Sequence, residues 1–383
     1  MITLVHILTV ILSLFWISGG LIQILGTLIG LWPNKIQKKV VPAFSWEPIS
    51  ILKPLRGLDV GLEANLTTFL TLDYPSYEIL FSVTSVNDPA YSVAKKLMEQ
   101  YPNVATRLFV DSVEVGPNPK VNNMRVSYEA SRNDLILISD SNVRVTRDYL
   151  KILSGYLRDP KVGMVTAVIS GSHEEGLGGR LEAVFLNTFY ARSMRLLFFL
   201  NRPCVVGKSM LFRKTVAKRF GGIAVLARYL AEDYMAGEAI KRLGLSVVLA
   251  TEPVTQYIGQ LKLKDFWLRH IRWGRIRKSQ VLLAFLIEPF FGAVLPGVMG
   301  AYAFYLQFQF NPFLFFILHM LIFFLLEIPF IKKIKGTITP LVFFIWFLRE
   351  LLALPLWLNI AWGNTVHWRG RTFKLRQGGL LAE

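Results

Sequence analysis

The chain has 383 residues, of which 53% are hydrophobic, and its formal net charge is +17. This length accommodates two domains, or one domain together with membrane helices, and the composition is too apolar for an ordinary soluble domain. The sequence contains no recognisable nucleic-acid-binding module. We therefore expect the positive charge to interact with anionic phospholipid and a phosphate-bearing substrate, and we expect no nucleic acid as partner. A single cysteine, Cys204, excludes an intramolecular disulfide and a cysteine-rich zinc site.

Residues 1–32 predict an N-terminal transmembrane helix. The stretch Ile2–Trp32 is nearly free of charge and is long enough to span a bilayer with some tilt. It lacks the basic n-region of a cleaved signal peptide, so we expect an uncleaved anchor. Lys35, Lys38 and Lys39 follow it directly, and by the positive-inside tendency they place the next part of the chain in the cytoplasm.

Residues 33–260 predict a cytoplasmic catalytic domain of the α/β class. Short apolar runs that are typical of strands alternate there with polar helical runs, as in sheets covered on both faces. The predicted strands are Ile49–Lys53, Ile79–Ser85, Thr106–Val110, Leu135–Ser139, Val162–Ile169 and Val205–Phe212. Ligands of such sheets bind at the carboxyl ends of the strands, which is where Asp88 and Asp140 lie.

Three loops after predicted strands each allow two interpretations. Pro54 and Arg56 lie in a loop that suits a nucleobase or ribose, or that is an ordinary strand-to-helix turn. Asp88 precedes a proline and either binds the nucleotide or caps a helix. Lys120 either lies near a phosphate or is a solvated loop lysine.

Asp140-Ser141-Asn142 predicts a divalent metal site. Hard cations on nucleotide phosphates are held by one or two protein oxygen ligands, often from an acid-x-acid pair at a strand end. Because Asn142 offers only a neutral amide oxygen, we expect Mg²⁺ or Mn²⁺ to arrive largely with the diphosphate. The alternative is that Asp140 only caps the turn.

Glu232 and Asp233 open a predicted helix that ends at Leu243. Acids in a first turn often only complement the helix dipole. An inverting sugar transfer, however, needs a carboxylate that deprotonates the acceptor hydroxyl. Asp233 is our candidate for this base, and Glu232 is the nearby alternative.

Residues 261–280 predict a basic amphipathic helix at the membrane interface. Arg269 and Arg272 lie one turn apart on one face, where they can bind a departing diphosphate, and Trp273 can wall the acceptor site. The other interpretation is a lipid-surface helix whose arginines meet anionic headgroups. Both interpretations can hold together.

Residues 281–362 predict C-terminal membrane segments. The candidates are Val281–Leu306, Phe313–Ile331 and Ile338–Trp362. Arg349 and Glu350 lie at the centre of the last segment, and charges there are costly unless they pair or face a cavity. We therefore expect a re-entrant or interfacial pair in that segment, with the basic tail, residues 363–383, in the cytoplasm.

The acids and the basic-aromatic motif, in this order, resemble the ceramide glucosyltransferase family of inverting glycosyltransferases with the GT-A fold. The resemblance extends over nearly the whole chain. Its motifs include Lys53-Pro54-Leu55-Arg56-Gly57, Asn87-Asp88-Pro89-Ala90, Asp140-Ser141-Asn142, Ala231-Glu232-Asp233-Tyr234 and the Arg-x-x-Arg-Trp of Arg269–Trp273. It implies a nucleotide-sugar-binding domain with a mixed, mainly parallel sheet, in which Asp88 binds the nucleotide, Asp140 serves metal and diphosphate, and Asp233 is the base.

The resemblance further implies a bacterial inner-membrane enzyme that moves one sugar, glucose by preference, from a UDP-sugar to the primary hydroxyl of ceramide or a similar lipid. Phe189-Tyr190-Ala191-Arg192 stands where animal members carry His-Pro-Arg, so a hopanoid or another lipid alcohol is an alternative acceptor. A processive polysaccharide synthase shares the acids and the final motif. An inactive transferase-like membrane scaffold is the alternative that is not an enzyme.

Overall fold

The computed structural model describes residues 2–32, 46–111, 114–368 and 371–382, so the predicted cytoplasmic lysines 35, 38 and 39 lie outside the described residues. The chain forms two compact units. The sheet unit comprises Pro33–Glu174, Leu197–Gln260 and Gly379–Glu383. The helical unit comprises Met1–Trp32, Glu175–Leu196 and Leu261–Gly378.

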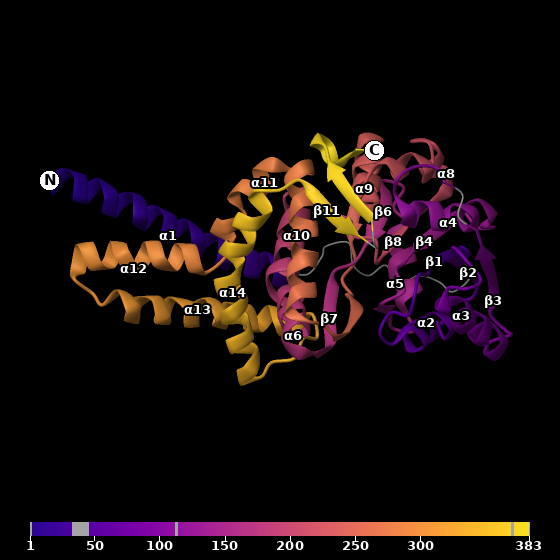
Figure 1. Ribbon diagram of the computed structural model, residues 1–383, viewed down its shortest axis with the longest axis horizontal. Coiled ribbons are helices and arrows are strands. Elements are labelled where there is room, and N and C mark those ends of the chain that lie inside the picture. The colour runs from indigo at the N-terminus through magenta and orange to yellow at the C-terminus, as the bar shows by residue number, and fades with distance from the viewer. Residues whose placement is uncertain (1, 33–45, 112–113, 369–370, 383) are drawn as a thin grey trace. The chain divides into compact units, whose positions relative to one another are not determined.

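The sheet unit is built on a seven-stranded sheet in the order β3-β2-β1-β4-β8-β6-β9 (Figure 1). Its strands are β1 (Ile49–Pro54), β2 (Tyr77–Val83), β3 (Ala105–Val110), β4 (Leu135–Ile138), β6 (Val162–Thr166), β8 (Met210–Arg213) and β9 (Ser246–Leu249). β1 pairs in parallel with β2 and β4, whereas β8 runs antiparallel to β4 and β6. The predicted mixed, mainly parallel sheet is therefore confirmed.

A second, three-stranded sheet has the order β5-β10-β7. Its strands are β5 (Val143–Arg144), β7 (Ile169–Glu175) and β10 (Val254–Gln260). The predicted strand Val162–Ile169 is too long, because the structure has two strands there: β6 ends at Thr166 and β7 begins at Ile169. The apolar residues of the turn between them gave one uninterrupted run in the sequence.

The helices of the sheet unit are α2 (Leu62–Leu70), α3 (Pro89–Gln100), α4 (Pro119–Ala130), α5 (Tyr149–Tyr156), α8 (Lys214–Lys218), η3 (Ala224–Arg228) and α9 (Glu232–Arg242). Of these, α2, α3, α4, α5 and α8 each follow a strand, whereas η3 and α9 come after α8. Asp88 and Asn118 cap α3 and α4, and each is followed by a proline at the first helical position, where the missing N–H costs nothing. These caps fix where the loops after β2 and β3 end.

One hydrophobic cluster holds α4 and α9 against the sheet. Met124 of α4 and Ile240 of α9 are buried in it together with Leu52 of β1, Ile136 of β4 and Phe212 of β8. Because the same cluster anchors both helices, their first turns have fixed positions beside the ends of β1 and β4. The polar residues of those turns build the site described below.

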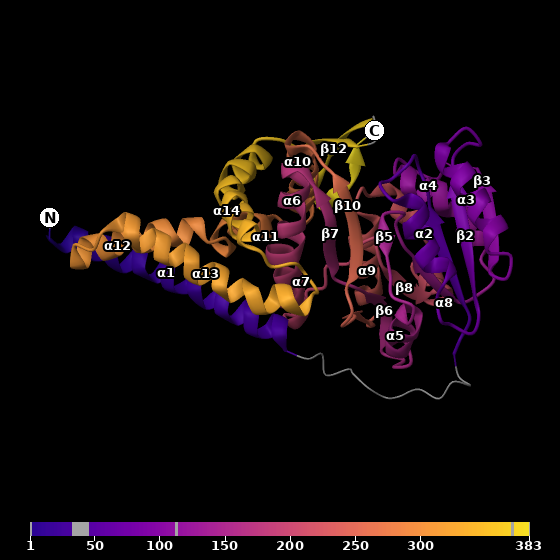
Figure 2. The ribbon, with the colours of Figure 1, turned by 90° about the horizontal axis from the view of Figure 1, so that it is seen from below.

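The helical unit contains the long apolar helices. Its helices are α1 (Ile2–Leu31), α6 (Gly176–Phe185), η2 (Leu186–Tyr190), α7 (Ala191–Phe199), α10 (Leu263–Gln280), α11 (Leu282–Ile287), η4 (Glu288–Phe291), α12 (Val294–Phe308), α13 (Pro312–Lys333) and α14 (Pro340–Ala361). Two strands follow, β11 (Thr365–Trp368) and β12 (Arg371–Leu375). The last elements along the chain are η5 (Gln377–Gly379) and β13 (Leu381–Ala382), and β13 belongs to the sheet unit. Within the described residues three helices, α1, α13 and α14, are long and apolar enough to cross a membrane, and the bent pair of α11 with η4 and α12 would be a fourth if it forms one span. α1 packs along α12 and α13 (Figure 2).

Two expectations about the membrane segments are corrected. The predicted segment Val281–Leu306 is broken, because α11 with η4 meets α12 at an angle of 53°. The predicted re-entrant or interfacial pair at Ile338–Trp362 is instead one continuous helix, α14. Arg349 and Glu350 stay within that helix because they form an ion pair with each other and are almost completely buried, with 7% and 3% of their side chains exposed.

Candidate active site

The site begins where β1 and β4 end side by side. The fully buried Lys53 of β1 donates hydrogen bonds from Nζ to the Ser139 hydroxyl at 3.1 Å and to the Asp140 carbonyl at 3.0 Å. Burial lowers the pKa of Lys53 well below its ordinary value, although Asp140 opposes this shift. Lys53 therefore holds the turn that carries Asp140, a role that the sequence did not indicate.

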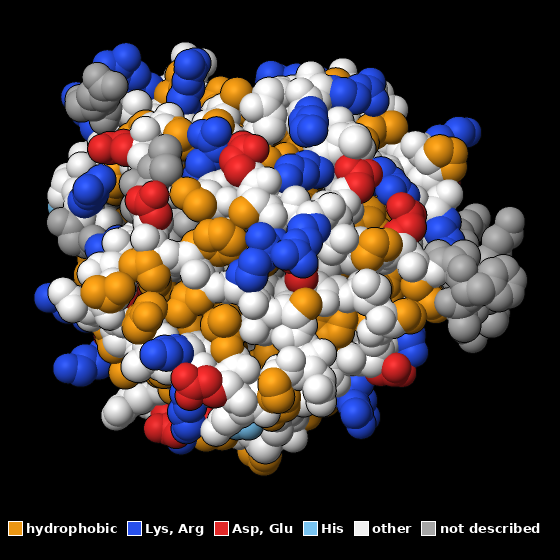
Figure 3. Space-filling view, turned by 90° about the vertical axis from the view of Figure 1, so that its right-hand side faces the viewer, with side chains coloured by type: hydrophobic (Ala, Val, Ile, Leu, Met, Phe, Trp, Pro, Cys, Tyr) orange, Lys and Arg blue, Asp and Glu red, His pale blue; other side chains and the backbone are white. Residues whose placement is uncertain are grey.

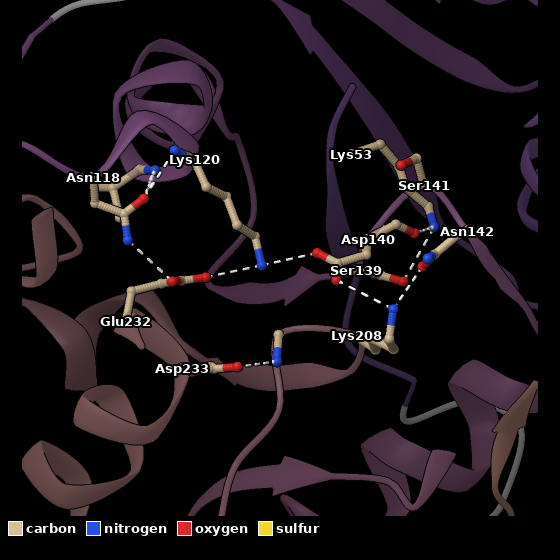
Figure 4. Close-up of polar contacts among 12 residues, drawn as sticks. Lys53, Asn118, Lys120, Ser139, Asp140, Ser141, Asn142, Lys208, Glu232 and Asp233 are labelled. Carbon is tan, nitrogen blue, oxygen red and sulfur yellow. Dashed lines mark hydrogen bonds and ion pairs between the residues drawn. The ribbon is translucent and has the colours of Figure 1, made fainter. Parts of the chain in front are cut away.

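Lys120 lies at the centre of the acidic residues. Its Nζ is 2.8 Å from Asp140 Oδ1 and 2.8 Å from Glu232 Oε1 (Figure 4). Asn118 donates from Nδ2 to the other oxygen of Glu232 at 3.1 Å. Burial alone would lower the pKa of Lys120, but Asp140, Glu232 and Asp233 together raise it above its ordinary value. With 13% of its side chain exposed and two carboxylate partners, Lys120 is a largely buried cation in the first turn of α4, and the alternative of a solvated loop lysine is wrong.

Asp233 is held by two backbone N–H groups. Its Oδ2 accepts from Gly207 at 2.7 Å and its Oδ1 accepts from Tyr234 at 2.8 Å. Burial, reinforced by the neighbouring Glu232, raises the pKa of Asp233 to about 7, while Lys120 and the two N–H groups act in the opposite direction. A carboxylate with this pKa can accept a proton near neutral pH.

Lys208 contacts both residues of the predicted metal pair. Its Nζ donates to Asn142 Oδ1 at 2.6 Å and lies 3.6 Å from Asp140 Oδ2. Figure 4 shows Lys120 and Lys208 on the two different carboxylate oxygens of Asp140. Positive charge is thus already placed where a nucleotide diphosphate and its cation are expected to bind.

The donor set at Asp140 and Asn142 fits a hard divalent cation that brings ligands of its own. Both side chains offer oxygen, and 30% of the Asp140 side chain is exposed. Across the part of the chain that the structure describes, no cluster of three or more His, Cys, Asp or Glu side chains is arranged to hold a metal ion. One carboxylate and one amide suit a cation whose remaining ligands are phosphate oxygens and water.

Asp88 fastens the loop after β1 to the start of α3. Its carboxylate accepts hydrogen bonds from the backbone N–H groups of Gly57 and Ala90, both at 2.9 Å. Pro54 is buried at the end of β1, and Arg56 is exposed in the loop that Asp88 holds. The helix-capping interpretation of Asp88 is confirmed, and nucleotide binding by this loop stays a prediction.

The arginine motif lies on α10 in the helical unit. Arg269 donates from Nη1 to Glu182 of α6 at 3.1 Å, and His270 Nε2 is 2.9 Å from the other oxygen of the same carboxylate. Glu182 is completely buried, and the His270 ring packs between Phe266 and Trp273. α6 therefore orients the motif, and the sequence gave no indication of Glu182 because its partners lie 87 and 88 residues further along the chain.

The loop before β8 also belongs to the site. The predicted strand Val205–Phe212 starts too early, because β8 begins at Met210 and residues 205–209 form a loop. This loop carries Gly207 and Lys208, which sequence reasoning placed inside a strand and therefore missed. The only local signal was a glycine within an apolar run, which often marks a close backbone approach.

We predict that Gly207→Ala strongly reduces activity while the protein stays folded. A Cβ atom at this position would lie 2.3 Å from Lys120 Nζ and 3.4 Å from Asp233 Oδ2, so the ammonium group must move off its two carboxylates. We expect turnover to fall by about 100-fold, because displaced charges no longer stabilise the transition state. Steady-state kinetics on purified protein will measure this.

Gly155→Ala is the matched control for this substitution. Gly155 lies in α5, and a Cβ atom there has no heavy atom within 4 Å. The control should keep full activity. Wild-type turnover in Gly207→Ala would show that the contact between Gly207 and Lys120 does not matter for catalysis.

On one face of the sheet unit, charged side chains form small separate groups. Figure 3 shows lysine and arginine side chains there, interspersed with acidic, hydrophobic and uncharged ones. Among the side chains coloured on this face, the basic groups do not join into one continuous surface of the kind that follows a phosphate backbone.

The mixed sheet and the charged groups at its strand ends define a glycosyltransferase of the GT-A type. The fold is similar to that of a mannosyltransferase from Pyrobaculum calidifontis solved with GDP-Man and Mn2+, with a TM-score of 0.53 and 14% identity over 94% of this chain and 99% of that one. The sequence profile of glycosyl transferase family 21 matches residues 15–381, and the chain belongs to this family.

Curated relatives agree with this assignment. Ceramide glucosyltransferase 1 of Caenorhabditis elegans is 29% identical over 352 residues, which cover 91% of this chain and 76% of that protein. The ceramide glucosyltransferase of Komagataella phaffii is 30% identical, with 86% of this chain and 82% of that protein covered. The predicted membership of the ceramide glucosyltransferase family and the predicted enzyme class are confirmed, and the inactive scaffold is set aside.

Proposed function

We propose that this protein transfers glucose from UDP-glucose to the primary hydroxyl of ceramide or a similar lipid, with inversion at the anomeric carbon. The observation that carries this proposal is Asp233, a carboxylate with a pKa of about 7 held beside the cluster of Lys120, Asp140 and Glu232. The named activity of the relatives supports the choice of sugar and acceptor. Asp233 is the base, and Glu232 holds Lys120 in place.

In the proposed reaction the acceptor oxygen attacks the anomeric carbon while Asp233 takes the hydroxyl proton. The bond between that carbon and the phosphate oxygen breaks, and UDP leaves with the bonding electron pair. Lys120 and Lys208 carry positive charge next to Asp140, where they stabilise the negative charge that develops on the diphosphate. In this proposal Asp88, Pro54 and Arg56 bind the nucleoside part.

Asp140 and Asn142 would hold the divalent cation, Mg²⁺ or Mn²⁺, which supplies Lewis-acid stabilisation of the diphosphate when it is bound. The chain's own contribution is to keep the Asp140 turn in place through Lys53. In the same proposal Arg269 and Arg272 bind the diphosphate, and Trp273 walls the acceptor site.

We also propose that the protein lies in a bacterial inner membrane, with its sheet unit on the cytoplasmic side. Lys333 donates from Nζ to the carbonyl oxygens of Leu31 and Trp32, at 2.5 and 3.3 Å, so the C-terminal ends of α1 and α13 lie at one level. Lys332 and Lys333 are the last residues of α13. The chain passes from the end of α1 into the sheet unit. Basic residues at one end of membrane helices favour the cytoplasmic side.

The test is mass spectrometry of lipid products. Purified protein in nanodiscs is offered UDP-glucose, UDP-galactose, UDP-N-acetylglucosamine or UDP-glucuronate, each with ceramide and with a hopanoid alcohol. We expect glucosylceramide, whose β-linkage is read from the anomeric proton by NMR. Sugar transfer only to the hopanoid, or an α-linked product, would contradict the proposed acceptor or the proposed inversion.

Asp140→Ala should weaken metal-dependent binding of UDP. The substitution removes the only anionic ligand of the proposed metal pair and one carboxylate partner of Lys120. We expect the dissociation constant of UDP in the presence of Mg²⁺ or Mn²⁺ to rise about 10-fold, measured by calorimetry. An unchanged metal dependence of UDP binding would show that the metal binds elsewhere. The control is Asp73→Ala, which removes an exposed ion pair with Lys151.

Arg272→Ala should lose most of its catalysis while the protein remains in the membrane. We expect turnover to fall by about 100-fold, because a cation that stabilises the leaving diphosphate is removed. The apolar helices α1, α13 and α14 hold the protein in the bilayer independently of this side chain. Membrane fractionation measures attachment, and steady-state kinetics measures turnover. A variant that leaves the membrane but keeps full activity would show that α10 serves to bind the membrane and not the diphosphate.

A further inference from the structure

The helical unit contains a pocket at the bend between α11 and α12. It is a shallow, partly open hollow lined by η4, the start of α12, α14 and Phe189. Most of its wall is apolar, with Pro289, Val294, Leu354 and Trp357 among the lining residues. A mostly apolar wall with a few polar groups is the composition typical of sites for organic ligands.

A charged pair lies in this apolar wall. Arg349 and Glu350 of α14 form an ion pair with 7% and 3% of their side chains exposed, and both line the pocket. Glu350 accepts a hydrogen bond from the Ala293 N–H at 2.8 Å, which fastens α14 to the bend. An uncharged side chain could accept the same hydrogen bond from Ala293. The bond therefore does not explain why two charged residues are kept in a helix that is apolar enough to cross a membrane.

The pocket is connected to the aromatic motif through stacked side chains. The guanidinium group of Arg349 lies 4.6 Å from the ring centroid of Phe189 and 5.6 Å from that of Phe185. Phe185 in turn contacts the rings of His270 and Trp273, at 4.4 and 6.3 Å between centroids. A ligand in the pocket therefore lies next to the residues that support Trp273, the predicted wall of the acceptor site.

The charge of the lining selects a neutral ligand. Arg349 compensates Glu350, and the third charged lining residue, Glu288, is compensated by a bidentate pair with Arg277 at 2.7 and 2.9 Å. In contrast to the chain as a whole, the pocket carries no excess positive charge for an anionic headgroup. It offers guanidinium donors and carboxylate acceptors, which match the carbonyl, N–H and hydroxyl groups of an uncharged amide-bearing lipid.

We propose that this pocket binds the polar end of the acceptor lipid, a neutral lipid of the ceramide class. Its amide and hydroxyl groups bond to Arg349 and Glu350, and its chains lie against the apolar wall formed by Val294, Leu354 and Trp357. This inference rests on the proposed function for the identity of the lipid, and it assigns to Arg349 and Glu350 a role in acceptor binding.

The experiment uses the full chain in phosphatidylcholine nanodiscs and a ceramide with a photoactivatable diazirine in its acyl chain. Leu354→Trp fills the pocket and should reduce crosslinking to pocket residues and raise the KM for ceramide, each by about 10-fold, without changing the KM for UDP-glucose. Leu351→Trp is the matched control, because Leu351 lies on the exposed face of the same helix. It should behave as wild type.

A second variant separates recognition from packing. Arg349→Met combined with Glu350→Gln removes both charges but keeps an acceptor for the Ala293 N–H, and buried ion pairs replaced in this way often leave stability unchanged. We expect it to melt near the wild-type temperature, with ceramide crosslinking reduced about 10-fold. An excess of phosphatidylglycerol should not compete with the probe, and competition would overturn the assignment to a neutral lipid.

The outcomes distinguish this inference from the proposed function. If both variants keep wild-type crosslinking and KM while wild-type protein makes glucosylceramide, the pocket inference is overturned and the function stands. If the wild type makes no glucosylceramide but ceramide still labels pocket residues and Leu354→Trp abolishes that labelling, the pocket inference stands and the proposed acceptor reaction fails.

Discussion

Asp233→Asn is expected to abolish sugar transfer while UDP and metal binding persist. An amide cannot accept the proton of the acceptor hydroxyl, and loss of a general base lowers turnover by about 1,000-fold. Asparagine retains an oxygen that can accept from Gly207, so the local geometry changes little. Turnover with ceramide and UDP-glucose, and UDP affinity by calorimetry, are the two measurements. Near-normal turnover would remove Asp233 from the mechanism.

The pH profile provides an independent check of the same group. Because burial and Glu232 raise the pKa of Asp233 to about 7, its basic form predominates only above that pH. Wild-type turnover should therefore rise as the pH increases through about 7 and then level off, and the residual rate of Asp233→Asn should lack this rise. A wild-type profile that is flat between pH values of about 5 and 9 would assign the base to another residue.

Most of the strands that could be predicted from the sequence contain a buried apolar run, and the partly buried β3 is an exception. β1 is buried at every position, which is why its sequence is unmistakable. β7 and β10 were missed because their buried and exposed residues alternate irregularly and include polar residues such as Gln256. The hairpin of β11 and β12 lies in a segment that was predicted only as a basic tail. Local apolarity does not reveal strands of this kind.

The acids of the site could be predicted, but their partners could not. Asp140 and Asp233 follow or open clear elements, and their chemistry is visible in the sequence alone. Lys120 joins Asp140 to Glu232, and the Gly207 N–H reaches Asp233, only because the sheet brings together loops that are far apart in the chain. Lysine and glycine occur too widely in loops for such pairings to be read from one sequence.

The membrane segments show the same limit in another form. Arg349 and Glu350 favour a re-entrant or interfacial pair in the sequence, because charges at mid-membrane are costly unless they pair or face a cavity. In the structure the two adjacent residues compensate each other, and Phe185 and Phe189 cover the guanidinium group, so α14 remains continuous. The break occurs instead at η4, where Pro289 lies within a largely apolar sequence and Gly292 follows the last residue of η4. Proline and glycine were the better guides to the bend.

Lys120→Met is expected to disrupt the site more broadly than the loss of one charge suggests. Asp140, Glu232 and Asp233 all interact with this ammonium group, and Glu232 is 5% exposed. Without the cation, the buried Glu232 loses its ion-pair partner and Asp140 keeps only Lys208 at 3.6 Å, which costs about 3 kcal/mol of folding free energy for a buried pair. Turnover should fall by about 1,000-fold, because charge at the diphosphate and the geometry of the base are lost together.

The pH profile distinguishes this effect from simple unfolding. Lys120 lowers the pKa of Asp233, so its removal should shift the rise in the residual rate to higher pH than in wild type. The double variant Lys120→Met with Glu232→Gln also removes the unpaired charge of Glu232; its melting temperature should recover while its turnover stays low. Lys96→Met, at an exposed pair with Glu63, is the control and should change neither property. A Lys120→Met profile that rises at the wild-type pH would show that Lys120 and Asp233 do not share one electrostatic site.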